Sequence, residues 1–100
     1  MRKIVLLCAQ GMSSGMLMKR IREAAMEQSY ECEIKAFSVS QAAKSCADAD
    51  CILIGPQVRY ELETVSNLFP DKPVFVVDLK DYGRLNGKNV LNTIKEKLND

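Results

Sequence analysis

Residues 3–15, K-I-V-L-L-C-A-Q-G-M-S-S-G, decide the fold of this chain. The run from Lys3 to Leu7 is aliphatic and β-branched without alternation, which predicts a strand buried on both faces. The polar, glycine-containing stretch after it breaks the strand. From Gly15 onward, apolar residues recur at helical spacing, at Leu17, Ile21, Ala24 and Ala25. The chain therefore opens with a strand, a short loop and a helix.

The rest of the chain repeats this alternation of strand and helix. Three further strands are predicted at Glu31–Phe37, Cys51–Ile54 and Val74–Val77, with the first of these toward an edge. The segments Ser40–Ala47, Val58–Phe69 and Val90–Leu98 are predicted as helices, and Leu79–Asn86 as a loop. Four such units predict one α/β domain over residues 1–100, with a three-layer architecture and right-handed crossovers. The simplest arrangement is a four-stranded parallel sheet in the order 2-1-3-4 with helices on both faces, as in flavodoxin-like and low-molecular-weight-phosphatase-like folds.

Composition excludes several classes of function. Hydrophobic residues make up 47% and charged residues 27% of the 100 residues, which is typical of a globular domain and excludes disordered and fibrous chains. The formal net charge of +1 argues against bulk nucleic-acid binding and against a polybasic membrane anchor. The chain has no histidine, so a Ser-His or Cys-His pair, a histidine-ligated metal or a phosphohistidine would need a partner's histidine.

The N-terminal apolar run and the cysteines predict the compartment. The run Ile4–Ala9 is shorter than a signal-peptide core, and no stretch approaches the roughly 18 apolar residues that span a bilayer. We therefore expect a cytoplasmic protein without direct membrane insertion, in which the cysteines are reduced thiols. No C-x-x-C pair is present, which argues against a zinc ribbon or a redox dithiol. Three cysteines, Cys32, Cys46 and Cys51, lie in or beside apolar segments and are expected to be small buried hydrophobes.

Cys8 differs because it begins the loop after the first strand. In the order 2-1-3-4 the order of the strands reverses between strands one and three. In such sheets ligands bind at this point, beyond the carboxyl ends of the strands. The loop amides and the first-turn amides of the helix would surround a tetrahedral anion and favour a thiolate, so Cys8 would be a nucleophile near neutral pH. The residues expected to hold a phosphoryl group are Ala9, Gln10, Gly11, Met12, Ser13, Ser14 and Gly15. The alternative, in which Cys8 is only a small core residue, stays open.

The loop partly matches C-x5-R, the phosphate loop of low-molecular-weight protein tyrosine phosphatases. Ser14 stands where that motif has its arginine, so the loop lacks a bidentate clamp for the phosphoryl oxygens. A phosphatase-like or arsenate-reductase-like enzyme using Cys8 is therefore an alternative that the missing arginine disfavours. Its general acid would be Asp78 or Asp81, which also fit ordinary loop carboxylates. A receiver-like module is disfavoured as well, because Cys8-Ala9 and Gly55-Pro56 occupy positions where receivers carry acidic residues.

Several motifs together resemble one family. They are I-V-L-L-C-A-Q-G-M-S-S-G at residues 4–15, G-P-Q at residues 55–57, K-P-V at residues 72–74 and Y-G at residues 82–83. Over essentially its whole length the chain resembles the enzyme IIB component, lactose/cellobiose (chitobiose) type, of the phosphoenolpyruvate-dependent sugar phosphotransferase system. The resemblance implies a phosphotransferase in which Cys8 is the phosphocysteine intermediate and Ala9–Gly15 form the loop that holds the phosphoryl group.

The resemblance also implies partners and cargo. The phosphoryl group would come from a phosphohistidine of the IIA protein and pass to a sugar bound in the membrane IIC permease, with which the cytoplasmic domain would associate peripherally. A β-linked disaccharide such as cellobiose or chitobiose is the expected sugar, and no metal or cofactor is required. Gln10 and Met12, with Gln57 and Tyr82 on neighbouring loops, are possible contacts at the rim for both partners. Lys19, Arg20 and Arg22 could steer an acidic partner, although a solvated helix face is the commoner explanation of such a cluster.

Overall fold

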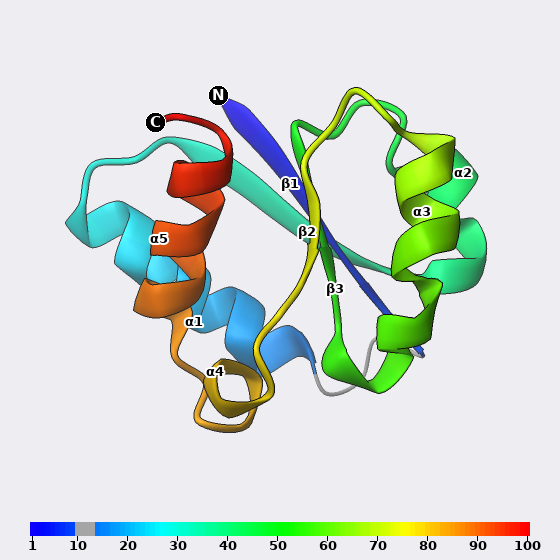
Figure 1. The fold of residues 1–100 in the computed structure, drawn as a ribbon. Helices are drawn as coiled ribbons and strands as arrows, with labels where there is room; N and C mark the ends of the chain where they lie inside the picture. Colours follow the sequence, from blue (N-terminus) through cyan, green and yellow to red (C-terminus); the bar gives the residue numbers. More distant parts are fainter. Residues whose placement is uncertain (10–13) are drawn as a thin grey trace.

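A single sheet of four parallel strands forms the middle layer of the molecule (Figure 1). The computed structural model describes residues 1–9 and 14–100. The strands lie in the order β2-β1-β3-β4. Their bounds are Arg2–Cys8 for β1, Cys32–Ser38 for β2, Cys51–Ile54 for β3 and Val74–Val76 for β4. The predicted fold class and strand order are confirmed.

β1 is the central element of this sheet. It pairs along its whole length with β2, from Arg2 opposite Cys32 to Cys8 opposite Ser38. On its other edge it pairs with β3, from Ile4 opposite Cys51 to Leu7 opposite Ile54. Its last five residues are all buried, as expected for a strand covered on both faces. The unbroken apolar run in the sequence therefore indicates a strand that has other strands on both edges and helices on both faces.

Helices cover the two faces of the sheet (Figure 1). The long helices α1 (Ser14–Glu27) and α5 (Gly87–Lys97) pack side by side on one face, with the short α4 (Leu79–Gly83) beside them. The other face carries α2 (Ala42–Ser45) and α3 (Leu62–Leu68), each preceded by a 3₁₀ turn, η1 (Val39–Gln41) and η2 (Pro56–Glu61). Within residues 1–9 and 14–100, no helix has the length and apolar character needed to cross a membrane.

Strand alternation divides the core into two apolar layers. Ile4 and Leu6 of β1 pack with buried residues of α1 and α5, whereas Val5 and Leu7 pack on the other face toward α2 and α3. On the first face α5 approaches α1 very closely at Gly87, where a Cβ atom would lie 2.3 Å from the backbone carbon of Arg20. Only glycine fits at that crossing, so Gly87 sets the distance between the two long helices.

Several predicted boundaries differ from the structure. The helices predicted at Ser40–Ala47 and Val58–Phe69 are each a 3₁₀ turn followed by a shorter α-helix, and Val58 has non-helical backbone angles (φ −120°, ψ 29°). The prediction of a loop over Leu79–Asn86 is wrong for Leu79–Gly83, which form α4. This helix is too short to show a period of apolar residues. Asp78 is its N-cap, and the Asp78 carboxylate accepts a hydrogen bond from the Lys80 amide at 2.8 Å.

Beyond the sheet, a polar cluster ties the two ends of the described chain together. The Asp100 carboxylate accepts hydrogen bonds from Arg2 Nε at 2.9 Å, Arg2 Nη2 at 2.8 Å and Tyr30 Oη at 2.5 Å. Lys95 Nζ lies 5.2 Å from the centre of the Tyr30 ring. The cluster joins β1, the turn after α1 and the end of α5. Hydrogen bonds from Arg2 and Tyr30 lower the pKa of Asp100 from 3.8 to about 2.

This lowered pKa predicts a pH-dependent contribution to stability. The ionised carboxylate stabilises the folded state above its unfolded pKa of 3.8, and the stabilisation is lost as the pH falls toward 2. We expect Asp100→Asn to lower the melting temperature at pH 7, and the difference from wild type to shrink between pH 4 and pH 2. Calorimetry across this range measures both values, with the exposed Asp71→Asn as control. A difference that does not change with pH would contradict the assignment.

Candidate functional site

Cys8 is the last residue of β1 and lies where the strand order reverses, between β1 and β3. Its side chain is only 4% exposed. By strand alternation it points to the same face as Ile4 and Leu6, which is the face that α1 covers. Cys8 Sγ lies 3.7 Å from the backbone carbonyl oxygen of Phe37 and donates its S–H to it. The thiol is thus held at the carboxyl edge of the sheet.

Ser38 is the neighbour of Cys8 on the β2 side. The two residues are paired in register, so their side chains lie on the same face of the sheet. The Ser38 hydroxyl donates to the Ala9 carbonyl oxygen at 3.5 Å and lies 3.0 Å from the Ser40 hydroxyl. The Ser38 hydroxyl, at the end of the edge strand, therefore contacts the first residue of the loop after Cys8, and the Ser40 hydroxyl of η1 is bonded to it.

Gly55 is the neighbour of Cys8 on the β3 side. Its N–H donates to the Leu7 carbonyl at 2.8 Å and so continues the pairing of β3 with β1. A Cβ atom at Gly55 would lie 3.7 Å from Cys8 Cβ and 3.4 Å from the Leu7 carbonyl oxygen. Glycine at this position therefore adds no side chain of its own to the space beside the thiol.

The loop residues fall into two groups. Ala9 is exposed, and Gly15, in the first turn of α1, is exposed with no atom within 4 Å of where its Cβ would be. α1 begins at Ser14, so its N-terminal end lies at the same edge of the sheet as Cys8 (Figure 1). The predicted contacts of Gln10, Gly11, Met12 and Ser13 lie outside the described residues.

The two predicted rim residues differ in exposure. Gln57 is exposed in η2, and its Oε1 atom would lie 3.4 Å from a Cβ at Gly55, so the side chain stands close to the Cys8 edge. Tyr82 is only 7% exposed and packs in the core with Val77 and Leu91. A side chain buried to this extent offers little surface to a partner. We therefore assign Tyr82 to packing beneath α4.

Asp78, Asp81 and Arg22, three of the predicted charged residues, have partners within the fold. The carboxylates of Asp78 and Asp81 accept hydrogen bonds, the first from the Lys80 amide and the second from Asn89 Nδ2 at 2.7 Å. Arg22 Nη2 donates to the carbonyl of Ile34, at 2.9 Å, on the outer edge of β2. These contacts give structural roles to the acids that a phosphatase would need and to one of the three basic residues on α1.

The other cysteines are separate from this edge. Cys46 and Cys51 are fully buried, and Cys32 is half-buried at the start of β2. Burial raises the pKa of all three thiols, that of Cys51 to about 12. At neutral pH these thiols are protonated and poorly nucleophilic. Their expected role as small apolar residues is confirmed for Cys46 and Cys51, whereas Cys32 keeps part of its surface exposed.

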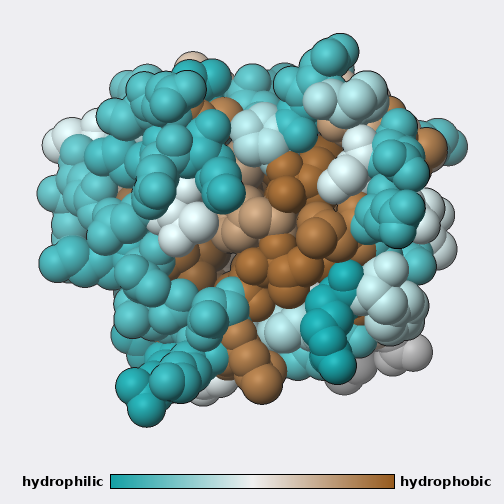
Figure 2. Space-filling view, in the orientation of Figure 1, coloured by the Kyte–Doolittle hydropathy of each residue, from teal (hydrophilic) through white to brown (hydrophobic). Residues whose placement is uncertain are grey.

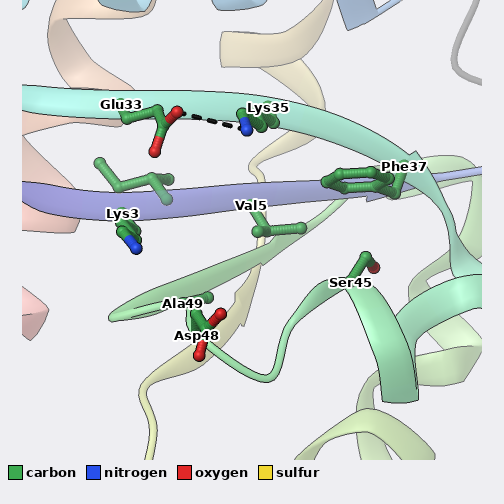
Figure 3. A pocket seen from close by; sticks show the side chains of 9 residues that line it. Lys3, Val5, Glu33, Lys35, Phe37, Ser45, Asp48 and Ala49 are labelled. Carbon is green, nitrogen blue, oxygen red and sulfur yellow. Dashed lines mark ion pairs between the residues drawn. The ribbon is translucent and has the colours of Figure 1, made fainter.

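A small pocket lies elsewhere in the molecule (Figure 3). Its volume is about 140 Å³, and it opens over β1 and β2 on the face toward α2. Val5 and Phe37 line it together with charged residues, among which Glu33 and Lys35 form an ion pair at 3.3 Å. Because Cys8 points to the opposite face, this pocket is separate from the thiol.

Comparison with known proteins identifies the family. The family model for the lactose/cellobiose-specific IIB subunit of the phosphotransferase system matches residues 3–93. The chain belongs to this IIB family. IIB components are phosphotransferases that act in sugar phosphorylation together with IIA and IIC partners. The resemblance seen in the Cys8 loop and in G-P-Q is thereby confirmed.

Curated relatives and solved structures agree with the family. The oligo-β-mannoside-specific IIB component of Bacillus subtilis is 35% identical over 91 residues, covering 88% of this chain and 87% of the relative. The cellobiose-specific IIB component of Lactococcus lactis is 30% identical and covers 96% and 95%. A cellobiose-specific IIB structure from Borrelia burgdorferi has a TM-score of 0.81 at 28% identity, covering 98% and 92%. The lactose-specific IIB domain of Streptococcus pneumoniae, at 19% identity, shares the fold with a TM-score of 0.84 over 96% of each chain.

The pKa values of the buried thiols predict how this IIB chain reacts with alkylating agents. We expect iodoacetamide at pH 7.5 to leave Cys46 and Cys51 unmodified in the folded protein, because burial blocks access and disfavours the thiolate. In guanidinium chloride all the cysteines should react. Peptide mapping by mass spectrometry identifies the modified positions. Modification of Cys51 at the same rate in both conditions would contradict its burial.

Proposed function

We propose that this IIB chain carries a phosphoryl group on Cys8 between a IIA phosphohistidine and a sugar in the membrane IIC permease. The observation that carries the proposal is the position of Cys8, at the carboxyl end of the central strand and at the reversal point of the sheet. Ala9 and the residues that follow lead directly into α1, a helix of 14 residues whose first-turn amides are suited to an anion. The chain would act as one domain over residues 1–100.

The transfer is an in-line displacement at phosphorus. Cys8 Sγ attacks as the bond between phosphorus and the IIA imidazole nitrogen breaks, and the thiol proton ends on the imidazole that leaves. The resting S–H donates to the Phe37 carbonyl. Once sulfur is bonded to phosphorus it has no proton to give, so the hydrogen bond to the Phe37 carbonyl is lost. In the second transfer a sugar hydroxyl oxygen bonds to phosphorus as the bond between phosphorus and Cys8 sulfur breaks. The hydroxyl proton ends on the sulfur, which restores the thiol.

The surroundings of Cys8 fit a phosphoryl group in two ways. On the β3 side, Gly55 leaves room where any other residue would place a Cβ atom. On the β2 side, the hydroxyl of Ser38, the residue paired with Cys8, and the Ser40 hydroxyl bonded to it would donate to phosphoryl oxygens. We propose that these groups act with the amides of the Ala9–Gly15 loop, including the predicted contacts from Gln10, Gly11, Met12, Ser13 and Ser14. Such preformed dipoles stabilise the charge of the transferred group without a metal.

The partners and the cargo are proposed on the same basis. Gln57, exposed beside Gly55, would contact IIA and IIC at the rim. The relatives named for oligo-β-mannoside and cellobiose support a β-linked sugar as cargo. A thiol nucleophile needs a reducing compartment, which supports the cytoplasmic side of the membrane as the place of action. The phosphatase alternative gains no support, because Asp78 and Asp81 are both engaged in hydrogen bonds within the fold.

Phosphorylation of the purified chain tests the assignment of Cys8. We expect a IIA protein charged from phosphoenolpyruvate to add one phosphoryl group to the wild type and none to Cys8→Ser, because a serine hydroxyl stays protonated at neutral pH. Cys32→Ser, which removes the half-buried thiol, should be phosphorylated like the wild type. Intact-protein mass spectrometry measures the added phosphoryl mass in the wild type and in both variants. Phosphorylation of Cys8→Ser would refute the assignment, and turnover of para-nitrophenyl phosphate by the wild type would favour a phosphatase.

The space beside Gly55 provides a second test. In Gly55→Ala the new methyl group makes ordinary contacts at 3.4–3.7 Å, so the fold should persist with a melting temperature within about 5 °C of wild type. The methyl group would occupy room needed by the phosphoryl group, and we expect Cys8 to be phosphorylated roughly 10- to 100-fold more slowly. Gly83→Ala is the control, because no atom lies within 4 Å of its Cβ position. Equal rates in both variants would contradict the proposed space.

A further inference from the structure

The outer edge of β4 has no neighbouring strand within the described part of the chain. β4 pairs only with β3, and hydrogen bonds join the Ile52 amide to the Pro73 carbonyl at 3.0 Å and the Val77 amide to the Ile54 carbonyl at 2.9 Å. In a parallel pair, alternate residues turn their backbone groups to the neighbour. Residues 73, 75 and 77 therefore face β3. The N–H and C=O groups of Val74 and Val76 point outward from the sheet.

The side chains around this edge are apolar. All three residues of β4 are half-buried valine or phenylalanine, with no charge among them. Figure 2 shows a continuous apolar surface in the centre of the view, where Figure 1 shows β4 (yellow) and the neighbouring α3. Leu68 at 50% and Leu79 at 70% exposure flank the strand in sequence. An exposed apolar strand edge of this kind is a template for pairing with another strand.

The opposite edge of the same sheet is protected. On β2 the guanidinium of Arg22 donates to the outward carbonyl of Ile34 at 2.9 Å. The ion pair between Glu33 and Lys35, at 3.3 Å, adds two charged side chains to that strand. Charged residues on an edge strand discourage pairing with a second chain. One edge of the sheet is therefore blocked and the other, at β4, is open.

The geometry of this edge fits a second copy of the same chain. We propose that two copies associate through antiparallel pairing of β4, with the two-fold axis beside Phe75. Val74 of each copy then lies opposite Val76 of the other, and their outward backbone groups form four hydrogen bonds. Phe75 faces Phe75 of the second copy as the close, non-hydrogen-bonded pair. The contact is self-complementary, as a symmetric dimer requires.

The charges at the ends of the strand favour the antiparallel orientation. In the register centred on Phe75, Lys72 of one copy lies opposite Asp78 of the other, and the pair occurs twice. A parallel, in-register arrangement would instead bring like charges together at both ends. Because Lys72 Nζ also donates to the carbonyls of Ala47 and Ala49, at 2.7 and 2.6 Å, its charge is held in place near the strand. Complementary charges of this kind fix orientation more than they add affinity.

The dimer leaves the proposed phosphoryl site open. β3 separates β4 from β1, so the second copy does not cover the carboxyl end of β1, where Cys8 lies. Association through β4 therefore does not depend on the function proposed for Cys8. The contact involves fewer residues than the 20–30 a side of a typical stable interface, so we expect a reversible dimer that forms at high protein concentration.

Sedimentation velocity on the full chain between about 10 µM and 1 mM tests the proposal. We expect the mass to rise from the 11.2 kDa of one chain toward twice that value. Phe75→Glu places two carboxylates against each other at the axis and should raise the dissociation constant at least tenfold. Met26→Lys, which replaces an apolar residue 80% exposed on α1, is the matched control and should associate like the wild type.

A second measurement keeps the test independent of folding defects in the variants. In the wild type, hydrogen exchange at the amides of Val74 and Val76 should slow as the concentration rises, while amides of β2 should not change. Circular dichroism checks that Phe75→Glu is folded. A protein that stays monomeric at 1 mM would overturn the proposal, as would a dimer whose protected amides lie away from β4.

Discussion

The backbone hydrogen bonding of β1 on both of its edges is the constraint on which the rest of the structure depends. β1 is paired with β2 along its whole length and with β3 over Ile4–Leu7, and side chains cover both of its faces. A strand held in this way has no freedom to shift in register, because a slip of one residue would turn Ile4 and Leu6 to the wrong layer. The position of Cys8 is therefore fixed by the four buried residues that precede it in β1, Ile4–Leu7.

The same constraint explains how a small chain without histidine can carry out group transfer. A phosphotransferase that receives its phosphoryl group from a partner needs one nucleophile, a space for the group and dipoles around it. In the transfer proposed for this chain, the end of β1 would provide the sulfur, Gly55 just after β3 would leave space, and Ser38 at the end of β2 would provide a hydroxyl. The near-neutral charge of +1 is consistent with the proposal that amide dipoles of the loop, and not an excess of basic residues, hold the phosphoryl group.

The parts of the fold that could be predicted are those whose signal is local. Cys51–Ile54 was predicted with its correct bounds because the apolar run is short and closed by Gly55-Pro56. α4 could not be predicted, because a helix of five residues is too short to show a period of apolar residues. It depends instead on the Asp78 cap and on burial of Tyr82. For the same reason Tyr82 looked like a surface residue in a loop, although its ring lies in the core.

In the site, the sequence indicated the thiol and its loop but not the residues beside them. Ser38 is 30 positions from Cys8 and follows a strand predicted to end at Phe37, so no spacing rule connects the two residues. They become neighbours only through the register of β1 and β2, which is set by packing along the full strands. The carbonyl of Phe37, a backbone group, carries no sequence signal at all.

The Asp100 cluster has a consequence for the architecture of this protein. Through the contacts of Arg2 with Asp100, the first and last residues lie together at one end of the sheet, and Cys8 lies at the other (Figure 1). Ends that meet in this way can be joined by a short linker, so the chain is suited to circular permutation. A tether, a label or a fused domain attached there would stand a full strand length away from the Cys8 sulfur.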